Sequence, residues 1–592
     1  MATHSYDLIV VGSGAGALLG AIRAQEQGLR TLVIEKADLL GGTSALSGGG
    51  IWIPCNYDME RVGLKDDIAT AFGYVQRCAR GLASDVRVLA YVETASVMCD
   101  YLRSIGVPYQ ALPKYADYYP HIEGAMPGGR SMDPVDFDAA ALGLEQLEGM
   151  RACPPGSLIF GRMSMNALEA HSMLSREPKS RLRLLAIIAK YFFDYPWRRK
   201  TQRDRRLAGG QALVAGLLVA ARKYGVEIWP STAMRELLQD AQGRVNGVVA
   251  ERHGEQLTLH AHRAVLLGAG GFERNQSMRD QYLPPPSRAE WSATPQGGNT
   301  GDAHLASQRI GAQLHLMEHT WGVPSMDVPG EPSFRGIFVE RSLPGCMVVN
   351  QKGLRFVNES CPYPEFQQAM LAQHAQGHGA APAWIVFDAR FRSINPMGPL
   401  MPSSAVPDHK LPPEWLGKVY WKADSLSDLA QQIGVDAQGL VHSAARMCEF
   451  AEQGTDLDFD RGGNVFDRYY ADPRLKNPNL APIRKGPFYA MQLWPGDIGT
   501  KGGLLTDCDA RVLDTQGRVI EGLYCVGNNS ASVMGPSYPG AGSTLGPAMT
   551  FAYRAAAHMT GQSLALQNTH LLHRHTAGNS ATEAAATQDG SV

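Results

Sequence analysis

The sequence has few cysteines, and none stands in the arrangement that zinc sites or redox-active pairs use. Its 592 residues include nine cysteines, and no two of them form a Cys-x-x-Cys pair. Cysteines scattered in this way do not indicate a disulfide framework, and they favour a reducing compartment such as the cytoplasm. We therefore predict no metal site and no structural disulfide.

Long apolar runs and a strong net charge are missing as well. No stretch approaches the roughly 20 apolar residues that a membrane-spanning helix needs, and the first apolar run, Leu8–Val11, has only the length of a strand. We expect no membrane span and no secretory signal ahead of that strand. The formal net charge of −2 is too small to indicate nucleic acid as a partner.

One segment departs from this near-neutral background. Residues 176–206 contain eleven basic and three acidic residues around the apolar runs Leu184–Ile188 and Tyr191–Phe193. Basic residues that flank an apolar helix are typical of peripheral contact with an anionic membrane surface, here the inner face of the cell membrane. The alternative is a helix docked on the protein with its basic face in water.

Glycine is abundant, and the first glycine-rich turn separates a predicted strand from a predicted helix. Residues 6–11 have the short β-branched pattern of a buried parallel strand, Ala15–Gln27 has helical composition, and Leu32–Ile34 is the next strand. Glu35 closes that strand. This order predicts a βαβ unit with dinucleotide-binding spacing.

The length of the chain predicts two or more domains. Residues 276–485 are rich in proline and aromatic residues, whereas the segments on either side share the composition of the βαβ unit. We predict an α/β fold in which a Rossmann-like nucleotide-binding domain, residues 1–275 and 486–561, is interrupted by an α+β substrate domain at 276–485. The composition of residues 562–592 predicts a disordered tail.

The first turn has the three small residues that a dinucleotide fingerprint requires. Gly12 allows the tight turn, Gly14 lets the backbone approach a diphosphate, and Ala17 permits close packing of helix on strand. The helix start favours the negative phosphates. Glu35 can accept hydrogen bonds from ribose hydroxyls and disfavours the 2′-phosphate of NADP. The predicted diphosphate contacts are Gly12, Gly14, Ala15, Gly16 and Ala17.

A second glycine-rich loop after Glu35 favours FAD over NAD. An NAD-dependent dehydrogenase has no need of such a loop, whereas FAD is long enough to run along it, and its hydroxyl side chains can bond phosphate or ribityl oxygens. The alternative is an ordinary Gly/Ser loop. The predicted contacts in this loop are Lys36, Gly41, Gly42, Thr43, Ser44, Ser47, Gly48 and Gly49.

Several motifs together resemble the flavoproteins of the fumarate reductase and 3-ketosteroid dehydrogenase group. They are Gly-Gly-Thr-Ser (41–44), Gly-Ala-Gly-Gly-Phe (268–272), Thr-Gly-Asp (300–302), Gly-Gly-Leu (502–504) and Gly-Leu-Tyr-Cys-Val-Gly-Asn (522–528). The resemblance implies non-covalent FAD, because no histidine stands where members with covalent flavin carry one. The further contacts that it implies are Ala269, Gly270, Gly527, Asn528, Gly542, Thr544 and Leu545.

Within this group, the stretch Tyr-Pro-Gly-Ala-Gly (538–542) is similar to that of the 3-ketosteroid Δ1-dehydrogenases. The resemblance implies that the Tyr538 hydroxyl and the Gly542 amide bind a ketone oxygen, which stabilises the charge that develops there. It also implies that Tyr363, which follows an Asn-Glu-Ser turn, is the base. A second tyrosine assists it, and we favour Tyr118 over Tyr119.

The activity implied is 1,2-desaturation of a 3-ketosteroid or similar apolar cyclic ketone. Proton loss to a tyrosine and hydride transfer to flavin N5 produce the unsaturated ketone, and an acceptor such as a quinone then takes the electrons. The alternatives are a 3-ketosteroid 4(5α)-dehydrogenase or another cyclic-ketone desaturase, a fumarate-reductase-like reductase of activated double bonds, and a membrane-associated electron carrier. The region Met317–Trp321 lacks a His-Pro-Thr-Gly-like motif, which disfavours a dicarboxylate substrate.

Overall fold

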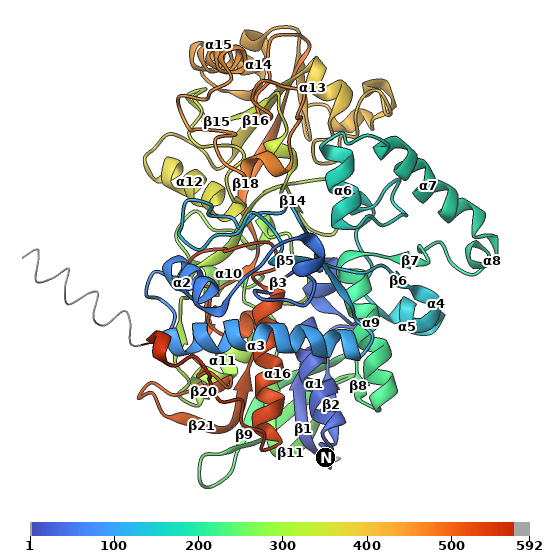
Figure 1. Cartoon of the computed structure of the whole chain (residues 1–592), viewed down its shortest axis with the longest axis vertical. Helices are drawn as coiled ribbons and strands as arrows, with labels where there is room; N and C mark the ends of the chain where they lie inside the picture. Colours follow the sequence, from blue (N-terminus) through green and yellow to red (C-terminus); the bar gives the residue numbers. More distant parts are fainter. Residues whose placement is uncertain (1–2, 573–592) are drawn as a thin grey trace, which may run out of the picture.

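The computed structural model describes residues 3–572 of the chain. Its lower half is built on an eight-stranded sheet (Figure 1), whose main path runs β20-β21-β11-β1-β2-β8. The parallel strands at its centre pair through buried aliphatic residues such as Leu8–Val11, as the sequence predicts for the βαβ unit. Their bounds, with the antiparallel edge strand first, are β20 (Arg511–Leu513), β21 (Val519–Cys525), β11 (Glu255–Leu267), β1 (Thr3–Val11), β2 (Thr31–Ile34) and β8 (Glu227–Trp229).

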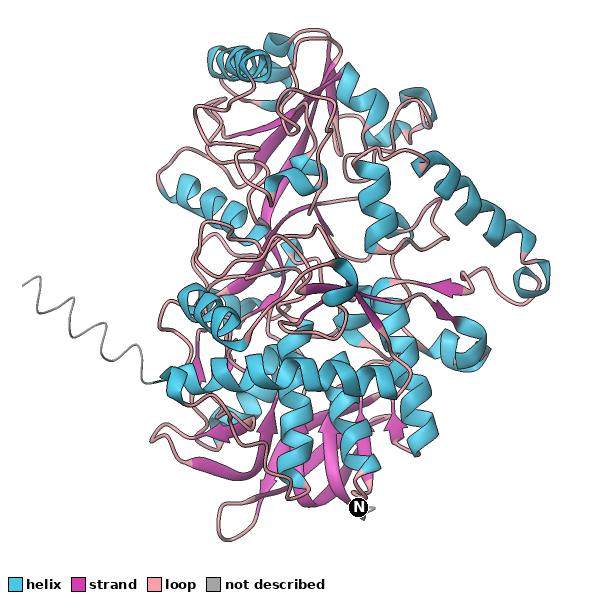
Figure 2. Ribbon diagram, in the orientation of Figure 1, coloured by secondary structure: helices cyan, strands magenta, loops and turns pink. Residues whose placement is uncertain are grey.

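Helices cover this sheet, and β9 (Thr232–Gln239) and β10 (Val245–Arg252) extend it as an antiparallel pair. Glycine allows a close contact between α1 and α16: a Cβ on Gly16 would lie 2.8 Å from the carbonyl oxygen of Ala548. Figure 2 shows these helices against the strands. The principal helices are α1 (Ala15–Glu26), α3 (Asp85–Ser104), α9 (Gly209–Tyr224) and α16 (Leu545–Met559).

A six-stranded sheet forms the core of the upper half. Every residue of its strands β15 and β16 is buried. The long strand β18 pairs with β13, β16 and β17, so this sheet continues past residue 485. We therefore propose that the inserted domain ends near Thr500. The strands are β13 (Thr320–Met326), β14 (Arg335–Gly336), β15 (Cys346–Val349), β16 (Ala383–Asp388), β17 (Trp421–Ala423) and β18 (Phe488–Thr500).

The helices of the basic segment lie in an arm that we define as residues 167–198. It consists of α6 (Ala167–Leu174), α7 (Ser180–Phe193) and α8 (Tyr195–Arg198) and projects from one side of the molecule (Figure 1). One face of α7 is buried against the loop before α6. Among residues 3–572, no helix has both the length and the apolar character needed to cross a membrane.

The first part of the predicted tail lies within the described residues and contacts the lower half of the protein. Leu571 is buried against the core of the lower half, with other leucines beside it. The carboxylate of Glu93 accepts hydrogen bonds from the backbone amides of Gln567 and Asn568, at 3.0 and 2.7 Å. Apolar residues within the polar tail explain this packing. The rest of the predicted tail, 573–592, lies outside the described residues.

Candidate active site

A single cavity of about 660 Å³ joins the nucleotide motif to the predicted catalytic tyrosines. Gly12 and Glu35 line it, as do Tyr363 and Tyr538, so residues of both halves share its wall. Of the predicted site residues, Gly41 alone does not line the cavity. Its φ is +101°, and a Cβ there would lie 2.8 Å from Val214, so it forms the turn into the loop.

The nucleotide end is shaped by a glycine turn and an oriented acid. Gly12 has a φ of +102°, and a Cβ there would lie 2.5 Å from the carbonyl oxygen of Gly268. Glu35 accepts hydrogen bonds from the backbone amide and the hydroxyl of Ser13, at 2.9 and 2.7 Å, and from the amide of Ala37 at 2.9 Å. Sequence reasoning missed this orienting role of Ser13, although it stands within the fingerprint.

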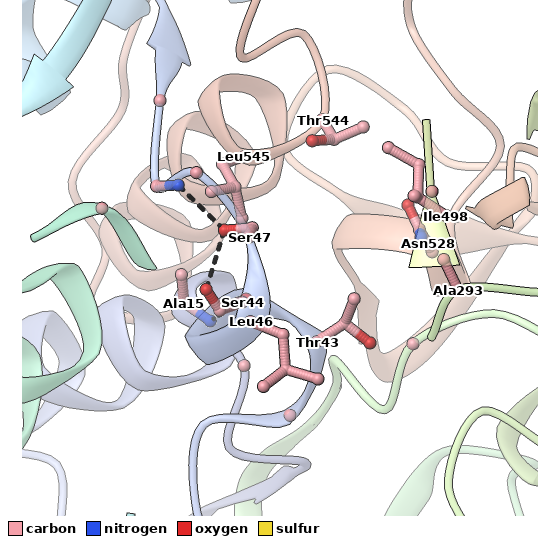
Figure 3. A pocket seen from close by; sticks show the side chains of 18 of the residues that line it. Ala15, Thr43, Ser44, Leu46, Ser47, Ala293, Ile498, Asn528, Thr544 and Leu545 are labelled. Carbon is pink, nitrogen blue, oxygen red and sulfur yellow. Dashed lines mark hydrogen bonds between the residues drawn. The ribbon is translucent and has the colours of Figure 1, made fainter. Parts of the chain in front are cut away.

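The loop that favoured FAD leaves room for a long cofactor. A Cβ on Gly42 or Gly48 would meet no atom within 4 Å, and both residues line the cavity. Figure 3 shows Ser44 and Ser47 beside this space. The Ser47 hydroxyl donates to the carbonyl of Ser44 at 2.8 Å, so its proton is used within the protein. Thr43 accepts a hydrogen bond from Asn299 at 3.0 Å and keeps its own proton to donate.

The ammonium group of Lys36 is engaged by other protein side chains. Its ammonium contacts Thr300 at 2.6 Å and Asp302 at 2.7 Å. These partners belong to the Thr-Gly-Asp motif, so two predicted motifs lie side by side across the cavity edge. The start of helix α16 also lines the cavity: its first residue, Leu545, lies there beside Thr544 (Figure 3).

Three predicted tyrosines meet at the other end of the cavity. Tyr363 is the first residue of α12 (Tyr363–Ala375), and Tyr538 lies in the loop before α16. Their ring centroids are 5.1 Å apart, and the rings of Tyr118 and Tyr538 are stacked at 5.3 Å. The Tyr118 hydroxyl donates to the Tyr363 hydroxyl at 3.3 Å. The structure therefore brings these three residues together from distant parts of the chain.

Burial keeps these phenols neutral in the protein alone. It raises the pKa of Tyr363 well above its usual value, while the hydrogen bond from Tyr118 acts in the opposite direction. Burial also raises the pKa of Tyr538, and the bonds to Tyr363 and Thr544 oppose it. A neutral Tyr538 is a hydrogen-bond donor, as a ketone oxygen requires. A donor placed on Tyr363 favours its phenolate, as a base requires.

Tyr119 turns away from this group. Its hydroxyl donates to the carboxylate of Glu365 and accepts from the backbone amide of Tyr538, and it does not line the cavity. This geometry supports Tyr118 over Tyr119 as the assisting residue. Sequence reasoning missed Tyr115, whose hydroxyl lies 3.3 Å from that of Tyr118.

The wall beyond the tyrosines is largely aromatic. Two of the arginines in it have partners: Arg335 pairs with Glu331, and Arg341 donates to the carbonyl of Glu359. Such a wall suits an apolar ring system better than a dicarboxylate. The aromatic lining residues are Tyr115, Phe334, Phe338, Phe466, Tyr469 and Tyr470. Adjacent aromatics at 469–470 were the available sequence signal for part of this wall.

Comparison with known proteins identifies the class to which this cavity belongs. The family model described as FAD binding domain matches residues 7–545, and the cofactor is FAD. The 3-oxosteroid 1-dehydrogenase of Comamonas testosteroni is 62% identical over 97% of this chain and 99% of its own length. The enzyme of the same name from Mycobacterium tuberculosis strain H37Rv is 38% identical over 95% of this chain and its own full length.

A solved structure agrees with these relatives. The 3-ketosteroid Δ1-dehydrogenase of Sterolibacterium denitrificans, crystallised with 1,4-androstadiene-3,17-dione, is 52% identical. It superposes with a TM-score of 0.92 and covers 94% of this chain, which covers all of it in turn. The chain therefore belongs to the 3-oxosteroid 1-dehydrogenase family of FAD-binding flavoproteins.

Proposed function

We propose that the protein desaturates 3-ketosteroids between C1 and C2, with FAD as the oxidant. The observation that carries the proposal is the position of Tyr363, Tyr538 and Tyr118 at one end of the cavity whose other end carries the nucleotide motif. The ketone oxygen accepts hydrogen bonds from the Tyr538 hydroxyl and the Gly542 amide. These two donors stabilise the negative charge that develops on oxygen as the α proton leaves.

Tyr363 removes that proton from C2, the carbon next to the ketone. The Tyr118 hydroxyl donates to it and stabilises its phenolate. Bound FAD supplies the acceptor for the hydride that leaves C1, so the steroid loses one proton and one hydride and gains a C1–C2 double bond. The aromatic wall holds the ring system and excludes water from the reacting carbons.

The decisive experiment is anaerobic reduction of the purified FAD-bound protein. Androst-4-ene-3,17-dione is expected to bleach the oxidised flavin, with one equivalent of the 1,4-diene formed per FAD. Retention of the flavin absorbance would contradict the proposal. In 5α-androstane-3,17-dione both the C1–C2 and the C4–C5 bonds are saturated, and we expect a Δ1 product. A Δ4 product would support a 4(5α)-dehydrogenase instead.

The same assay distinguishes the remaining candidate functions. A cyclic-ketone desaturase would be bleached by simple oxocyclohexane carboxylates and not by the steroid. In a double-bond reductase, fumarate would reoxidise the chemically reduced flavin. In an electron carrier, none of these ketones would change the flavin absorbance.

We propose that FAD is bound non-covalently. Among residues 3–572, no histidine lines the cavity, so the part of the chain that the structure describes offers no imidazole for attachment there. Acid denaturation is expected to release all of the flavin into the supernatant. Flavin that stays with the precipitated protein would contradict this.

We further propose that the arm contacts an anionic membrane surface. The outer face of α7 exposes Leu182, Leu185 and Phe193 to fractions of 63%, 61% and 85%. Lys190 of α7 and Arg199, which directly follows α8, are exposed as well, and this combination of apolar and basic residues is typical of interfacial helices. The buried inner face fits the docked alternative as well, so docking on the protein and contact with lipid use opposite faces of one helix.

Vesicle flotation tests this contact. The protein is expected to float with vesicles that contain anionic lipid, and less with zwitterionic vesicles. The double variant Leu185→Ser/Phe193→Ser is expected to remain at the bottom of the density gradient. Leu457→Ser is the matched control, since Leu457 is 69% exposed and lies outside the arm. Equal flotation of both variants would refute the proposal.

A protein at such a surface has access to lipid-soluble acceptors. We therefore propose a quinone as the electron acceptor, supported by the fact that α6 residues Ala167 and Ala170 line the cavity and also begin the arm. Rapid reoxidation of the reduced protein by a short-chain quinone is expected under anaerobic conditions. Reoxidation no faster than in buffer would contradict this.

A further inference from the structure

We propose that Tyr119 is a positioning residue that ties the helix bearing the base to the loop bearing the ketone donors. Its hydroxyl bridges the two elements: it donates to Glu365 in the first turn of α12, and it accepts the backbone N–H of Tyr538 at 3.0 Å. Glu365 stands two residues after Tyr363. The inference rests on the proposed function, because Tyr363 and Tyr538 matter as a pair only in that reaction.

The loop that carries Tyr538 is held mainly through its backbone. The carbonyl of Pro539 accepts from the Tyr74 hydroxyl at 2.7 Å and from the Tyr118 amide at 2.9 Å. The carbonyl of Ser537 accepts from the Lys501 ammonium at 2.7 Å. These contacts fix the loop to the body of the protein, and none of them reaches α12.

The contact made by Tyr119 differs from these in two respects. Within residues 3–572, the Tyr538 N–H has no second acceptor, whereas the Pro539 carbonyl has two donors. The contact is also shielded from water: Tyr119 is 5% exposed, and the Glu365 oxygen that Tyr119 does not reach is buried with no hydrogen-bond partner among the described residues. Loss of the Tyr119 hydroxyl would leave the buried backbone N–H of Tyr538 without an acceptor, in the residue whose hydroxyl binds the ketone.

The consequence is specific to ligands that carry a 3-ketone. When the tie is broken, the ketone donors move relative to the base, while the aromatic wall that holds the steroid rings is unchanged. Binding of a ketosteroid then weakens, and flavin reduction slows, but a steroid without the 3-ketone binds as before. A residue that served only general stability would affect both ligands alike.

The test compares Tyr119→Phe with the wild-type holoenzyme. We expect flavin reduction by androst-4-ene-3,17-dione to slow by about ten- to a hundredfold, the effect of one buried donor left without its acceptor. Affinity for 1,4-androstadiene-3,17-dione is expected to fall by about tenfold, with unchanged affinity for the 3-deoxy analogue. The FAD content of each preparation shows whether the variant has folded.

Two further variants keep the test decisive. Glu365→Leu removes the other end of the tie and is expected to give the same selective loss, which matters if Tyr119→Phe does not bind FAD. Tyr489→Phe is the matched control: it removes another part-buried tyrosine–carboxylate hydrogen bond, to Asp408 at 2.7 Å, and neither residue lines the cavity. The control is expected to react at the wild-type rate.

Three outcomes overturn the inference. They are an unchanged rate in Tyr119→Phe, an equal loss of affinity for the ketone and the 3-deoxy steroid, and a loss in Tyr489→Phe as large as that in Tyr119→Phe. Failure of the proposed function looks different, because the wild-type flavin would then not be reduced by the ketosteroid at all.

Discussion

Replacement of Tyr538 by phenylalanine isolates one hydroxyl in the candidate site. The side chain is 4% exposed, and its ring packs against those of Tyr363, Tyr118 and Trp321, with centroids 5.1 to 5.3 Å away. Phenylalanine keeps this packing, so fold and FAD content are expected to stay the same. What is lost is one of the two proposed donors to the ketone oxygen, and such a donor typically contributes about 3 kcal/mol in the transition state.

This magnitude corresponds to a loss of about a hundred- to a thousandfold in the rate of flavin reduction. Because burial raises the pKa of Tyr538, the hydroxyl stays protonated, and the loss is expected to be the same at pH 6 and pH 8. Anaerobic stopped-flow measurement of flavin bleaching gives the rate directly. Tyr6→Phe is the control, since its hydroxyl bonds Glu227 outside the cavity. A rate for Tyr538→Phe within threefold of the wild type, at full FAD content, would refute the assignment.

Three further predictions follow from the same geometry. Tyr363→Phe is expected to slow flavin reduction at least about a hundredfold, the usual contribution of a general base, while flavin absorbance stays normal; turnover near the wild-type rate would exclude it as the base. Gly48→Val is expected to prevent FAD retention by filling the cavity, whereas Gly149→Val, equally free of contacts but outside the cavity, keeps it; equal FAD content would contradict this. Burial and Asp497 raise the pKa of Glu273 from 4.5 to about 7, so the folded protein binds more protons than the unfolded one between these values, and the free energy of unfolding falls by about 3 kcal/mol as pH rises through that window; Glu273→Gln is expected to flatten this slope in denaturant titrations, and an unchanged slope would refute the pKa.

The parts of the fold that the sequence predicted well are those with local signals. The strand, turn and helix around Gly12 are each marked by nearby residues, and the structure has them as β1 and α1. The glycine-rich stretch after Thr500 resembles the nucleotide-binding domain, so composition assigns β18 to that domain, whereas its pairing supports the domain end near Thr500 proposed above. Its partner residues lie 65 to 180 positions away along the chain, and no local pattern reports them.

In the candidate site, too, local motifs were predicted from the sequence and contacts between distant residues were not. A family motif pointed to Tyr363 and Tyr538, but the motif did not decide between Tyr118 and Tyr119, because both stand in one short run. The choice depends on contacts across 245 and 246 residues, in which one hydroxyl faces Tyr363 and the next faces Glu365. Side-chain direction in an irregular loop follows from tertiary packing, which residue type alone does not determine.

The proposed mechanism requires that a ketone lies between its two donors and the base, next to the flavin ring. A crystal structure of the protein with FAD and a 3-ketosteroid measures this directly. We expect the ketone oxygen within hydrogen-bond distance of the Tyr538 hydroxyl and the Gly542 amide, with the Tyr363 hydroxyl facing C2. A steroid bound with its ketone towards the arm, or a flavin ring remote from these tyrosines, would contradict the mechanism.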